Sequence, residues 1–406
     1  MTPRPLRILT VADVPPDPNS GAAGTVWHTN VALRELGHEV DEIWSDQLGP
    51  RRIRHGNLHA LLEQPQAYRR EVLKATQRRQ YDVVQISQPQ AYLAAQALRA
   101  ADFRGVVVNR SHGVELRVNE VLPEWHRKLG VPESRFPRSV LTPLVRRLLE
   151  RQWSKVVRYC DGVIVPSEDD RDCVLRRLRI LDDRVRMIAH GAPDEYLKVP
   201  AQELTEPRLR RLLAVGQFAF FKAPQMISAV FNRVLNELPD CCATWVTSTA
   251  AIEEVHRLLA PAVINRVNVC GWGDQRDLIN VYDEHGVFIF PSLVEGAGKA
   301  SLEAMSRGMY VVASDSSAMR DYIRPGEHGC LAGVGDVDGF TSAVLHAIRN
   351  PQTARQVADR ARRRSLEYSW SKCACLAVDF YQEILGKQRP ANQRPAVDRI
   401  PAALEV

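Results

Sequence analysis

Two carboxylates, Glu295 and Glu303, lie eight residues apart within residues 286–308, which read GVFIFPSLVEGAGKASLEAMSRG. The first part of this stretch, residues 287–290, is a continuous apolar run and predicts a buried parallel strand. A loop with two glycines follows, and the sequence from Lys299 onward has the apolar spacing of a helix. The order strand, glycine loop, helix presents free backbone N–H groups and a positive helix end to an anion.

A nucleoside diphosphate is an anion that this arrangement could hold. The loop consists of Gly296, Ala297 and Gly298, and the first helical residues are Lys299, Ala300 and Ser301. With a diphosphate at the helix end, one glutamate would lie beside the group attached to the phosphate, and the other would accept hydrogen bonds from ribose hydroxyls. An ordinary strand–loop–helix unit with solvated glutamates is the open alternative, because a short glycine loop is a weak signal.

Residues around this loop resemble the donor-site motif of the family 4 glycosyltransferases. The matching segments are Phe290-Pro291-Ser292, residues 295–298, residues 302–305, Gly308 and Val312-Ala313-Ser314. Members of this family are retaining enzymes with the GT-B fold. The resemblance extends over residues 6–385 and implies an α/β protein. It implies two Rossmann-like domains that face each other across a cleft, and a C-terminal helix that crosses back to the first domain.

The chain is expected to divide into four parts. Residues 1–204 would form the N-terminal acceptor-side domain, and residues 205–367 the nucleotide-sugar donor domain. Residues 368–385 would form the crossover helix, which packs on the first domain. Residues 386–406 are rich in proline, alanine and charge and are expected to be a disordered tail. Both domains show the alternation of strands and helices that is typical of a parallel sheet.

The resemblance implies roles for residues in both domains. His112 follows a predicted strand and matches the family's histidine that contacts the donor sugar. Lys222 matches a lysine on the donor phosphates. Glu295 would hold the hydroxyls of the donor sugar, and Glu303 those of the ribose. The loop that contains Trp272 is expected to lie against the nucleotide base.

A second glycine loop, residues 19–24, contains Gly21 and precedes a helix predicted from Val26 to Leu36. In the family, this loop lies over the acceptor and the donor phosphates. A plain glycine turn that caps the helix is the alternative.

Three features depart from the family pattern. Gln217 stands where the family has an arginine on the donor phosphates, His190 lies where Pro-Asn-Gly is usual, and Ser316 and Ser317 replace a glycine pair. We expect an active enzyme to have replaced the missing arginine. Lys299 is the candidate, since it lies in the first turn of the anion-binding helix. The alternative is that Lys299 points to solvent while Gln217 binds the phosphate as a neutral donor.

These patterns predict a retaining glycosyltransferase that moves a sugar from a UDP- or GDP-sugar to a hydroxyl of a glycan or lipid-linked acceptor, as in polysaccharide biosynthesis. No cofactor is expected. No metal site is expected either, because the eight cysteines lack metal-type spacing and the resemblance implies metal independence. Two alternatives stay open: a nucleotide-sugar epimerase of the same fold, and a catalytically inactive regulatory or scaffold homologue. The missing arginine favours the second of these.

Composition fits a soluble protein, with 45% hydrophobic and 25% charged residues among 406. No run of 18 apolar residues exists, so we expect no transmembrane helix and a cytoplasmic protein. The net charge of +6 is mild. No nucleic-acid partner is expected.

Residues 139–158 predict a basic amphipathic helix. Its basic stripe consists of Arg147, Arg151, Lys155 and Arg158. One hypothesis is that this helix makes a peripheral contact with the anionic inner face of the membrane, where a lipid-linked acceptor would be found. The other is that its apolar stripe packs on the first domain and its arginines form a solvated face.

Overall fold

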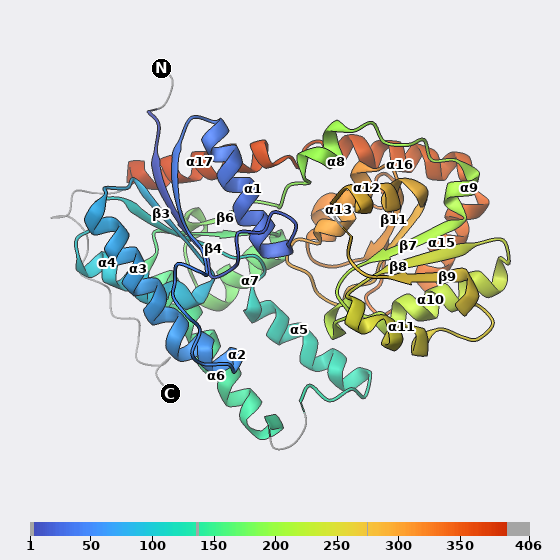
Figure 1. Ribbon diagram of the computed structural model, residues 1–406, viewed down its shortest axis with the longest axis horizontal. Coiled ribbons are helices and arrows are strands. Elements are labelled where there is room, and N and C mark those ends of the chain that lie inside the picture. Colours follow the sequence, from blue (N-terminus) through green and yellow to red (C-terminus); the bar gives the residue numbers. More distant parts are fainter. Residues whose placement is uncertain (1–3, 135–137, 274, 388–406) are drawn as a thin grey trace.

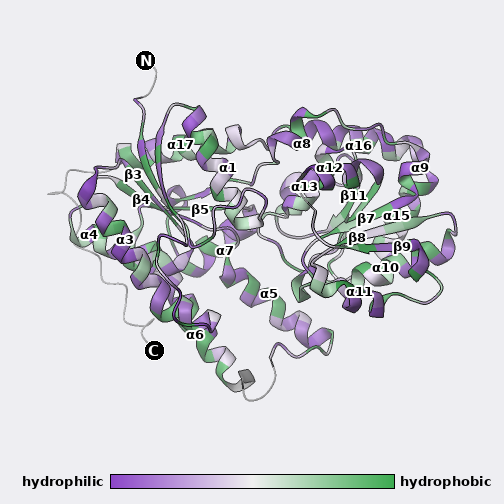
Figure 2. Cartoon of the chain, viewed as in Figure 1, coloured by the Kyte–Doolittle hydropathy of each residue, from purple (hydrophilic) through white to green (hydrophobic). Residues whose placement is uncertain are grey.

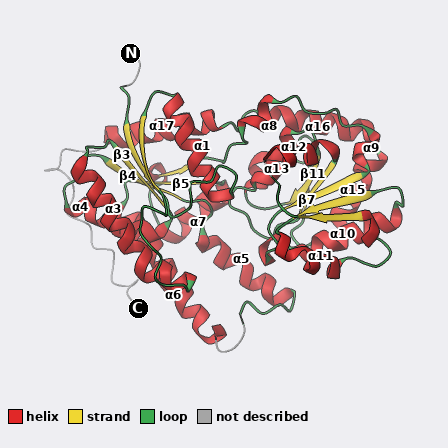
Figure 3. Cartoon of the chain, in the orientation of Figure 1, coloured by secondary structure: helices red, strands yellow, loops and turns green. Residues whose placement is uncertain are grey.

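The structure is a computed structural model of the 406-residue chain, and it describes residues 4–134, 138–273 and 275–387 (Figure 1). Within these ranges, two parallel six-stranded sheets lie side by side, each between layers of helices (Figure 3). This arrangement confirms the predicted α/β fold with two Rossmann-like domains. The predicted disordered tail lies outside the described residues from position 388 onward, whereas residues 386 and 387 belong to the last helix.

The first sheet has the strand order β2-β1-β3-β4-β5-β6. Its strands are β1 (Arg7–Val11), β2 (Glu39–Ile43), β3 (Val83–Ser87), β4 (Val106–Arg110), β5 (Gly162–Val165) and β6 (Val185–Met187). The central strands β3 and β4 are buried along their whole length, as expected for parallel strands with helices on both faces. Strand β4 ends two residues before His112, so it positions the predicted histidine.

Helices cover both faces of this sheet. They are α1 (Gly21–Glu35), α2 (Gly56–Leu58), α3 (Gln64–Arg78), α4 (Tyr92–Ala100), α5 (Glu115–Lys128), α6 (Arg138–Tyr159) and α7 (Glu168–Leu178). On one face, Leu33 of α1 packs with Val108 of β4. On the other, Tyr68 of α3, Trp153 of α6 and Val174 of α7 share a second core.

The second sheet has the strand order β12-β11-β10-β7-β8-β9. Its strands are β7 (Arg211–Val215), β8 (Cys242–Val246), β9 (Val267–Cys270), β10 (Val287–Phe290), β11 (Tyr310–Ser314) and β12 (Cys330–Ala332). Its helices are α8 (Asp194–Lys198), α9 (Glu206–Leu209), α10 (Pro224–Glu237), α11 (Ile252–Leu258), α12 (Gln275–Glu284), α13 (Lys299–Ser306), α14 (Ala318–Tyr322), α15 (Val337–Arg349) and α16 (Pro351–Ser365). The predicted strand at residues 287–290 is confirmed.

Helix α17 (Trp370–Lys387) crosses back to the first domain, as predicted (Figure 1). Its Phe380 and Tyr381 are buried against the first sheet. Gly162 of β5 makes this close packing possible, because a Cβ there would lie 2.8 Å from the Phe380 ring.

The predicted domain boundary at residue 204 stays a prediction, although Tyr196 and Leu204 pack in the cores of the second sheet.

Helix α6 has a buried inner half and an exposed outer half. Trp153 and Val156 are 1% and 0% exposed, whereas Leu141, Leu144 and Leu148 are 59%, 57% and 37% exposed. Figure 2 shows hydrophobic residues on the outer half. The packing hypothesis therefore holds for the inner half only. Among the described residues, no helix has the length and apolar character needed to cross a membrane.

Glu115 begins helix α5 and accepts a hydrogen bond from Nε1 of Trp153 in α6, at 2.9 Å. Burial raises the pKa of Glu115 to about 7, from an ordinary value of 4.5. The folded protein therefore holds the Glu115 proton more tightly than the unfolded chain does. This contribution to stability is complete below pH 4.5 and is lost as the pH rises to 7.

The variant Glu115→Gln should lack this pH dependence, because glutamine keeps an acceptor for Trp153 and carries no charge. Relative to wild type, it should gain about 3 kcal/mol of unfolding free energy between pH 4.5 and pH 8. Denaturant unfolding at both pH values measures this difference. Glu124→Gln, on an exposed part of the same helix, is the control and should show no such gain. Parallel pH profiles for wild type and Glu115→Gln would contradict the prediction.

Candidate functional site

The loop between β10 and α13 carries the predicted anion-binding helix end. Gly298 precedes the first residue of α13 and has φ of +58°, a conformation that glycine adopts without strain. A Cβ at this position would also lie 2.2 Å from Cε of Met319. Glycine is thus required by backbone and packing together. Gly298 has no side chain to cap the helix, so no side chain of this residue occupies the first N–H groups of α13, although the N–H of Ser301 donates to the carbonyl of Gly298.

Gly296 brings this loop against the first domain. A Cβ at Gly296 would lie 2.5 Å from the carbonyl oxygen of His112 and 2.8 Å from Cα of Gly113. The loop after β10 and the loop after β4 therefore touch backbone to backbone. This contact brings the loop of His112 in the first domain next to the loop of Glu295 in the second.

Lys222 and Glu295 form an ion pair in this cleft. The Lys222 Nζ lies 2.5 Å from Oε1 of Glu295, and the two side chains are only 18% and 11% exposed. The ammonium also lies over the rings of Phe290 and Phe221, at 4.7 and 5.5 Å from their centroids. The lysine and glutamate predicted to act on phosphate and sugar are thus adjacent, and their charges are compensated before any donor binds.

Glu303 and Lys299 form a second pair one helical turn apart. Oε2 of the buried Glu303 accepts a hydrogen bond from the Tyr282 hydroxyl at 3.0 Å, and its Oε1 lies 3.6 Å from Nζ of Lys299. Burial raises the pKa of Glu303, while Lys299 and Tyr282 oppose that shift. The Lys299 side chain is 14% exposed. It therefore does not point freely into solvent, contrary to the simpler alternative.

His112 presents an unpartnered imidazole at the end of β4. Its two ring nitrogens are buried, and neither bonds to another residue that the structure describes. Burial, followed by the charge of Arg110, lowers the pKa of His112 to about 3. The ring is therefore neutral at physiological pH, when one nitrogen donates and the other accepts. A neutral histidine suits a sugar hydroxyl better than a phosphate.

Arg110 supplies a positive charge behind this histidine. It is 1% exposed, and its Nη1 and Nη2 have no hydrogen-bond partner within the described part of the chain. Burial lowers the pKa of Arg110. A buried cation without a partner is costly to the fold. It makes this end of the first sheet attractive to negative charge.

The region between the two domains contains two further histidines. His190 Nδ1 lies 3.2 Å from Oγ1 of Thr25 in α1, and His28 of the same helix stacks on Trp370 with ring centroids 5.6 Å apart. Burial lowers the pKa of both histidines, and the charge of Lys299 contributes in each case. Helices α1, α13 and α17 thus converge here.

Gly21 lies at the start of a helix and not in a loop. Helix α1 begins at Gly21, five residues before the predicted start at Val26. That predicted start is wrong because Gly24 is a helical residue, tightly packed: a Cβ on it would lie 2.5 Å from the carbonyl oxygen of Pro18. The N-terminus of α1 is therefore a second helix end near the cleft.

The remaining predicted residues lie around the same edge of the second sheet. Gln217 is exposed in the loop that joins β7 to Lys222. Trp272, in the loop after β9, is 48% exposed and offers a flat apolar ring. Ala297 is buried, and Ala300 and Ser301 lie in the first turn of α13. The structure thus places the residues that were predicted to bind the donor at one edge of the second sheet.

Several residues of the site were missed by sequence reasoning. Tyr282 orients Glu303, Arg117 contacts the backbone of Glu295, and Thr25 and His28 lie between the domains. Thr25 and His28 carried a signal, since polar residues on the inner side of an amphipathic helix indicate a buried polar site. Tyr282 and Arg117 reach the site from distant elements and carried none.

Comparison with known proteins matches both halves of the chain to family models. Residues 19–196 match the model described as Glycosyltransferase Family 4, and residues 210–350 match Glycosyl transferases group 1. Together the two ranges contain every site residue that the sequence predicts.

Curated relatives are similar over parts of their length. The chain is 33% identical over 103 residues to the MMP alpha-(1->4)-mannosyltransferase of Mycolicibacterium hassiacum, which covers 25% of each protein. It is 27% identical over 116 residues to the O-antigen chain mannosyltransferase B of Escherichia coli, covering 29% of this chain and 30% of the relative. Alpha-maltose-1-phosphate synthase of Mycolicibacterium smegmatis is 26% identical over 250 residues, covering 56% and 64%. Each match spans less than two thirds of the relative.

Solved structures share the fold over nearly the whole chain. Sucrose-phosphate synthase from Thermosynechococcus elongatus superposes with a TM-score of 0.71 at 19% identity, over 94% of this chain and all of that one. HepE of Anabaena, in complex with UDP and glucose, gives 0.65 at 16% identity, over 92% and 98%. At such identities the likeness establishes the fold alone. From its two family models and its two facing sheets, the chain belongs to the family 4 glycosyltransferases and has the GT-B fold.

Proposed function

We propose that the protein transfers a sugar from a nucleotide-sugar to an acceptor hydroxyl, without a metal and with retention of the anomeric configuration. The observation that carries this proposal is the group of side chains between the domains. Two largely buried Lys–Glu pairs flank the free end of helix α13, and the loop of the neutral His112 meets the Glu295 loop from the first domain. The protein therefore offers a binding group at this place to each of the phosphate, the sugar and the ribose of the donor.

The difficult step is departure of the nucleoside diphosphate. The bond between the anomeric carbon and the phosphate oxygen breaks, and its electron pair leaves with the diphosphate. Lys222 and the N–H groups of α13 are fixed donors for that developing charge, and this kind of preorganised stabilisation is usually the largest catalytic contribution. The acceptor oxygen bonds to the anomeric carbon and gives its proton to the departing diphosphate oxygen.

The other groups orient the donor. Glu295, once Lys222 turns to the phosphate, is free to accept from the sugar hydroxyls, and His112 binds the sugar from the opposite side. Glu303 accepts from the ribose, and Trp272 stacks on the base. The close contact at Gly296 keeps water from the reacting carbon, and hydrolysis is the competing reaction.

A UDP- or GDP-sugar is the proposed donor, and a glycan or lipid-linked hydroxyl the acceptor. HepE, which shares the fold, was crystallised with UDP and with UDP-glucose. That observation favours UDP. An epimerase of the same fold would use the same donor without an acceptor, so transfer to an added acceptor separates the two activities.

Donor binding and turnover test the proposal with two matched variants. A UDP- or GDP-sugar should raise the melting temperature, because a ligand of the folded state stabilises it by mass action. Glu303→Gln keeps the Tyr282 contact and should raise the donor KM with little change in kcat. Glu295→Gln should lower kcat by roughly 10²-fold. Thermal shift and transfer of radiolabelled sugar measure both effects.

Two results would contradict these assignments. If both variants raised only KM, the role given to Glu295 in the chemical step would be wrong. If no UDP-, GDP- or ADP-sugar stabilised the protein and no labelled sugar were transferred, the transferase proposal would fail in favour of an inactive homologue.

We further propose that Lys299 replaces the missing arginine at Gln217. Lys299 lies in the first turn of α13, is mostly removed from solvent, and is close enough to His28 and His190 to influence their pKa values. A lysine at a helix N-terminus opposes the helix dipole by roughly 0.3–1 kcal/mol. Its pairing with Glu303 offsets that cost, and a diphosphate at the helix end would use the charge directly.

Lys299→Ala should lower kcat by roughly 10²-fold, because one preorganised cation is lost from the leaving group. Adding Gln217→Arg should restore much of the turnover. Lys198→Ala is the control, since Lys198 forms an i,i+4 pair with Asp194 in α8 but is 76% exposed. Steady-state kinetics at saturating donor measure the effect. Wild-type turnover in Lys299→Ala would refute the replacement.

We also propose that the outer half of α6 docks on an anionic lipid surface. Three leucines, Leu141, Leu144 and Leu148, are exposed there, and Arg147 and Arg151 are exposed beside them. Apolar side chains beside cations suit the boundary between lipid headgroups and acyl chains. Basic residues near an anionic leaflet contribute about 1 kcal/mol each.

Vesicle sedimentation tests this contact. The protein should bind vesicles with phosphatidylglycerol more than vesicles of phosphatidylcholine alone, and high salt should reduce binding. The double variant Leu141→Ser/Leu144→Ser should lose most of it. Leu376→Ser, at a 47% exposed leucine on α17, should behave as wild type. Equal binding to both vesicle types at low salt would end the proposal.

A further inference from the structure

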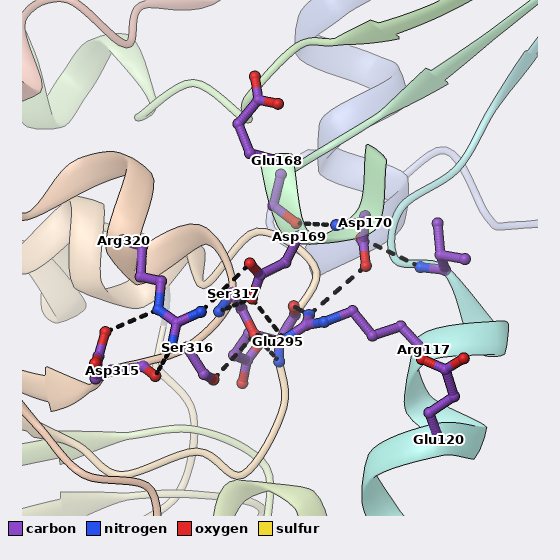
Figure 4. A network of polar contacts seen from close by, with 12 residues as sticks. Arg117, Glu120, Glu168, Asp169, Asp170, Glu295, Asp315, Ser316, Ser317 and Arg320 are labelled. Atoms are coloured by element: carbon purple, nitrogen blue, oxygen red, sulfur yellow. Dashed lines mark hydrogen bonds and ion pairs between the residues drawn. The ribbon is translucent and has the colours of Figure 1, made fainter. Parts of the chain in front are cut away.

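Arg117 of α5 spans the two domains beside the proposed active site (Figure 4). Although it belongs to the first domain, its Nη1 donates to the backbone carbonyl of Glu295 at 3.1 Å, and its Nη2 to Oγ of Ser317 at 2.8 Å. The residue is 8% exposed. One guanidinium thus holds two separate loops of the second domain. Its five donors in a rigid fork make such simultaneous contacts possible.

Two carboxylates of α7 complete the arrangement. Nη2 of Arg117 lies 3.0 Å from Oδ2 of Asp169, and Nη1 lies 3.6 Å from Oδ1 of Asp170. The same Asp169 oxygen accepts from the backbone N–H of Ser317 at 2.8 Å, which is a further hydrogen bond between the domains. Oδ2 of Asp170 accepts from the backbone N–H of Val114 at 3.3 Å, in the loop that carries His112. The loops of both proposed sugar-binding residues are tied to one cluster.

Ser317 has a backbone conformation that only a specific interaction would retain. Its φ and ψ are 60° and −152°, a region that belongs almost entirely to glycine. The resemblance predicts a glycine here. The serine found instead takes part in two hydrogen bonds. Its Oγ accepts from the backbone N–H of Glu295 at 3.0 Å and from Arg117. Strain at such a position indicates a function of the hydroxyl.

From these contacts we infer that Arg117, acting through Ser317, is a positioning residue that places Glu295 only when the two domains are closed. The inference rests on the proposed function. Glu295 is held at its N–H by Ser317 and at its carbonyl by Arg117. When the domains part, Arg117 and Asp169 withdraw with the first domain. The loop then loses its carbonyl contact, and Ser317 loses Arg117 and Asp169 and keeps the contact with the Glu295 N–H within its own domain.

This arrangement gives a reason for closure to precede chemistry. The donor would bind to the second domain through residues that Arg117 does not touch, such as Glu303 and Trp272. Glu295 would reach its working position only with the first domain, and therefore the acceptor side, in place. Hydrolysis of the donor in the open state would be suppressed, because one of its catalytic groups is misplaced there.

Ser317→Gly separates this positioning role from a merely structural one. Glycine relieves the strain, so the melting temperature should stay level or rise, whereas kcat should fall roughly tenfold because Glu295 loses the Oγ contact. Arg117→Gln should lower kcat by 10- to 100-fold for transfer and for hydrolysis alike, and leave the donor Kd and the ratio of hydrolysis to transfer unchanged. In the double variant the two losses should be less than multiplicative, since the residues act as a unit.

Arg176→Gln is the matched control for Arg117→Gln. Arg176 is an arginine of α7 on the same side of the first domain, 66% exposed and bonded to Glu120. Its replacement should leave kcat and the hydrolysis ratio at wild-type values. Arg117→Gln or Ser317→Gly with wild-type kcat would overturn the inference, as would a kcat loss that only follows a loss of melting temperature.

Small-angle X-ray scattering distinguishes this inference from the proposed function. Arg117→Gln should increase the radius of gyration of the ligand-free protein relative to wild type and Arg176→Gln, whether or not a donor is turned over. If wild type transfers no sugar yet the variant opens, the proposed function fails and the closure contact stands. If the radius is unchanged, the closure contact is refuted even if the enzyme is active.

Discussion

The site depends on a backbone contact between Gly113 and Gly296. Each glycine lies in a loop that follows a buried strand, one in each sheet, and a Cβ at Gly296 would overlap the carbonyl of His112. Two backbone segments can approach this closely only where neither residue has a side chain. The contact brings the loop of the neutral His112 in one domain against the loop that carries Glu295 in the other. The sheets and their helices fix the positions of these two loops.

Charge compensation explains how such a cleft can be stable without its substrate. Lys222 is paired with Glu295, and Lys299 with Glu303, so neither cation is buried alone. Each pair can be exchanged for a pair with phosphate or for hydrogen bonds with hydroxyls when a donor arrives. Arg110 differs, since its terminal nitrogens have no partner among the described residues. Because a buried cation without a partner destabilises the fold, the presence of Arg110 is better explained by an effect of its positive charge on ligand binding.

The sequence was most informative where a single segment carries both structure and chemistry. The run 287–290 is apolar throughout and was correctly predicted as a strand, and Glu295 and Lys299 follow it directly. Helix α3 was not predicted, because most of its residues are polar and few are buried. The start of α1 was misplaced because Gly24, read as a loop residue, packs inside the helix. Arg117 could not be found, since 178 positions separate it from Glu295 and only the tertiary fold joins them.

The departures from the family pattern bear on whether the protein is an enzyme. Loss of function relaxes the constraints on a site, so replacements should then accumulate without compensation. Here the serine that stands for a glycine retains a strained backbone, and its Oγ accepts hydrogen bonds from the backbone N–H of Glu295 and from Arg117. Lys299, which we propose as the replacement for the missing arginine, is paired and largely withdrawn from solvent. An inactive scaffold has no reason to keep a strained residue at the backbone of its former catalytic glutamate, because glycine would fold there at lower cost. The two replacements are better explained by an altered active site than by a lost one.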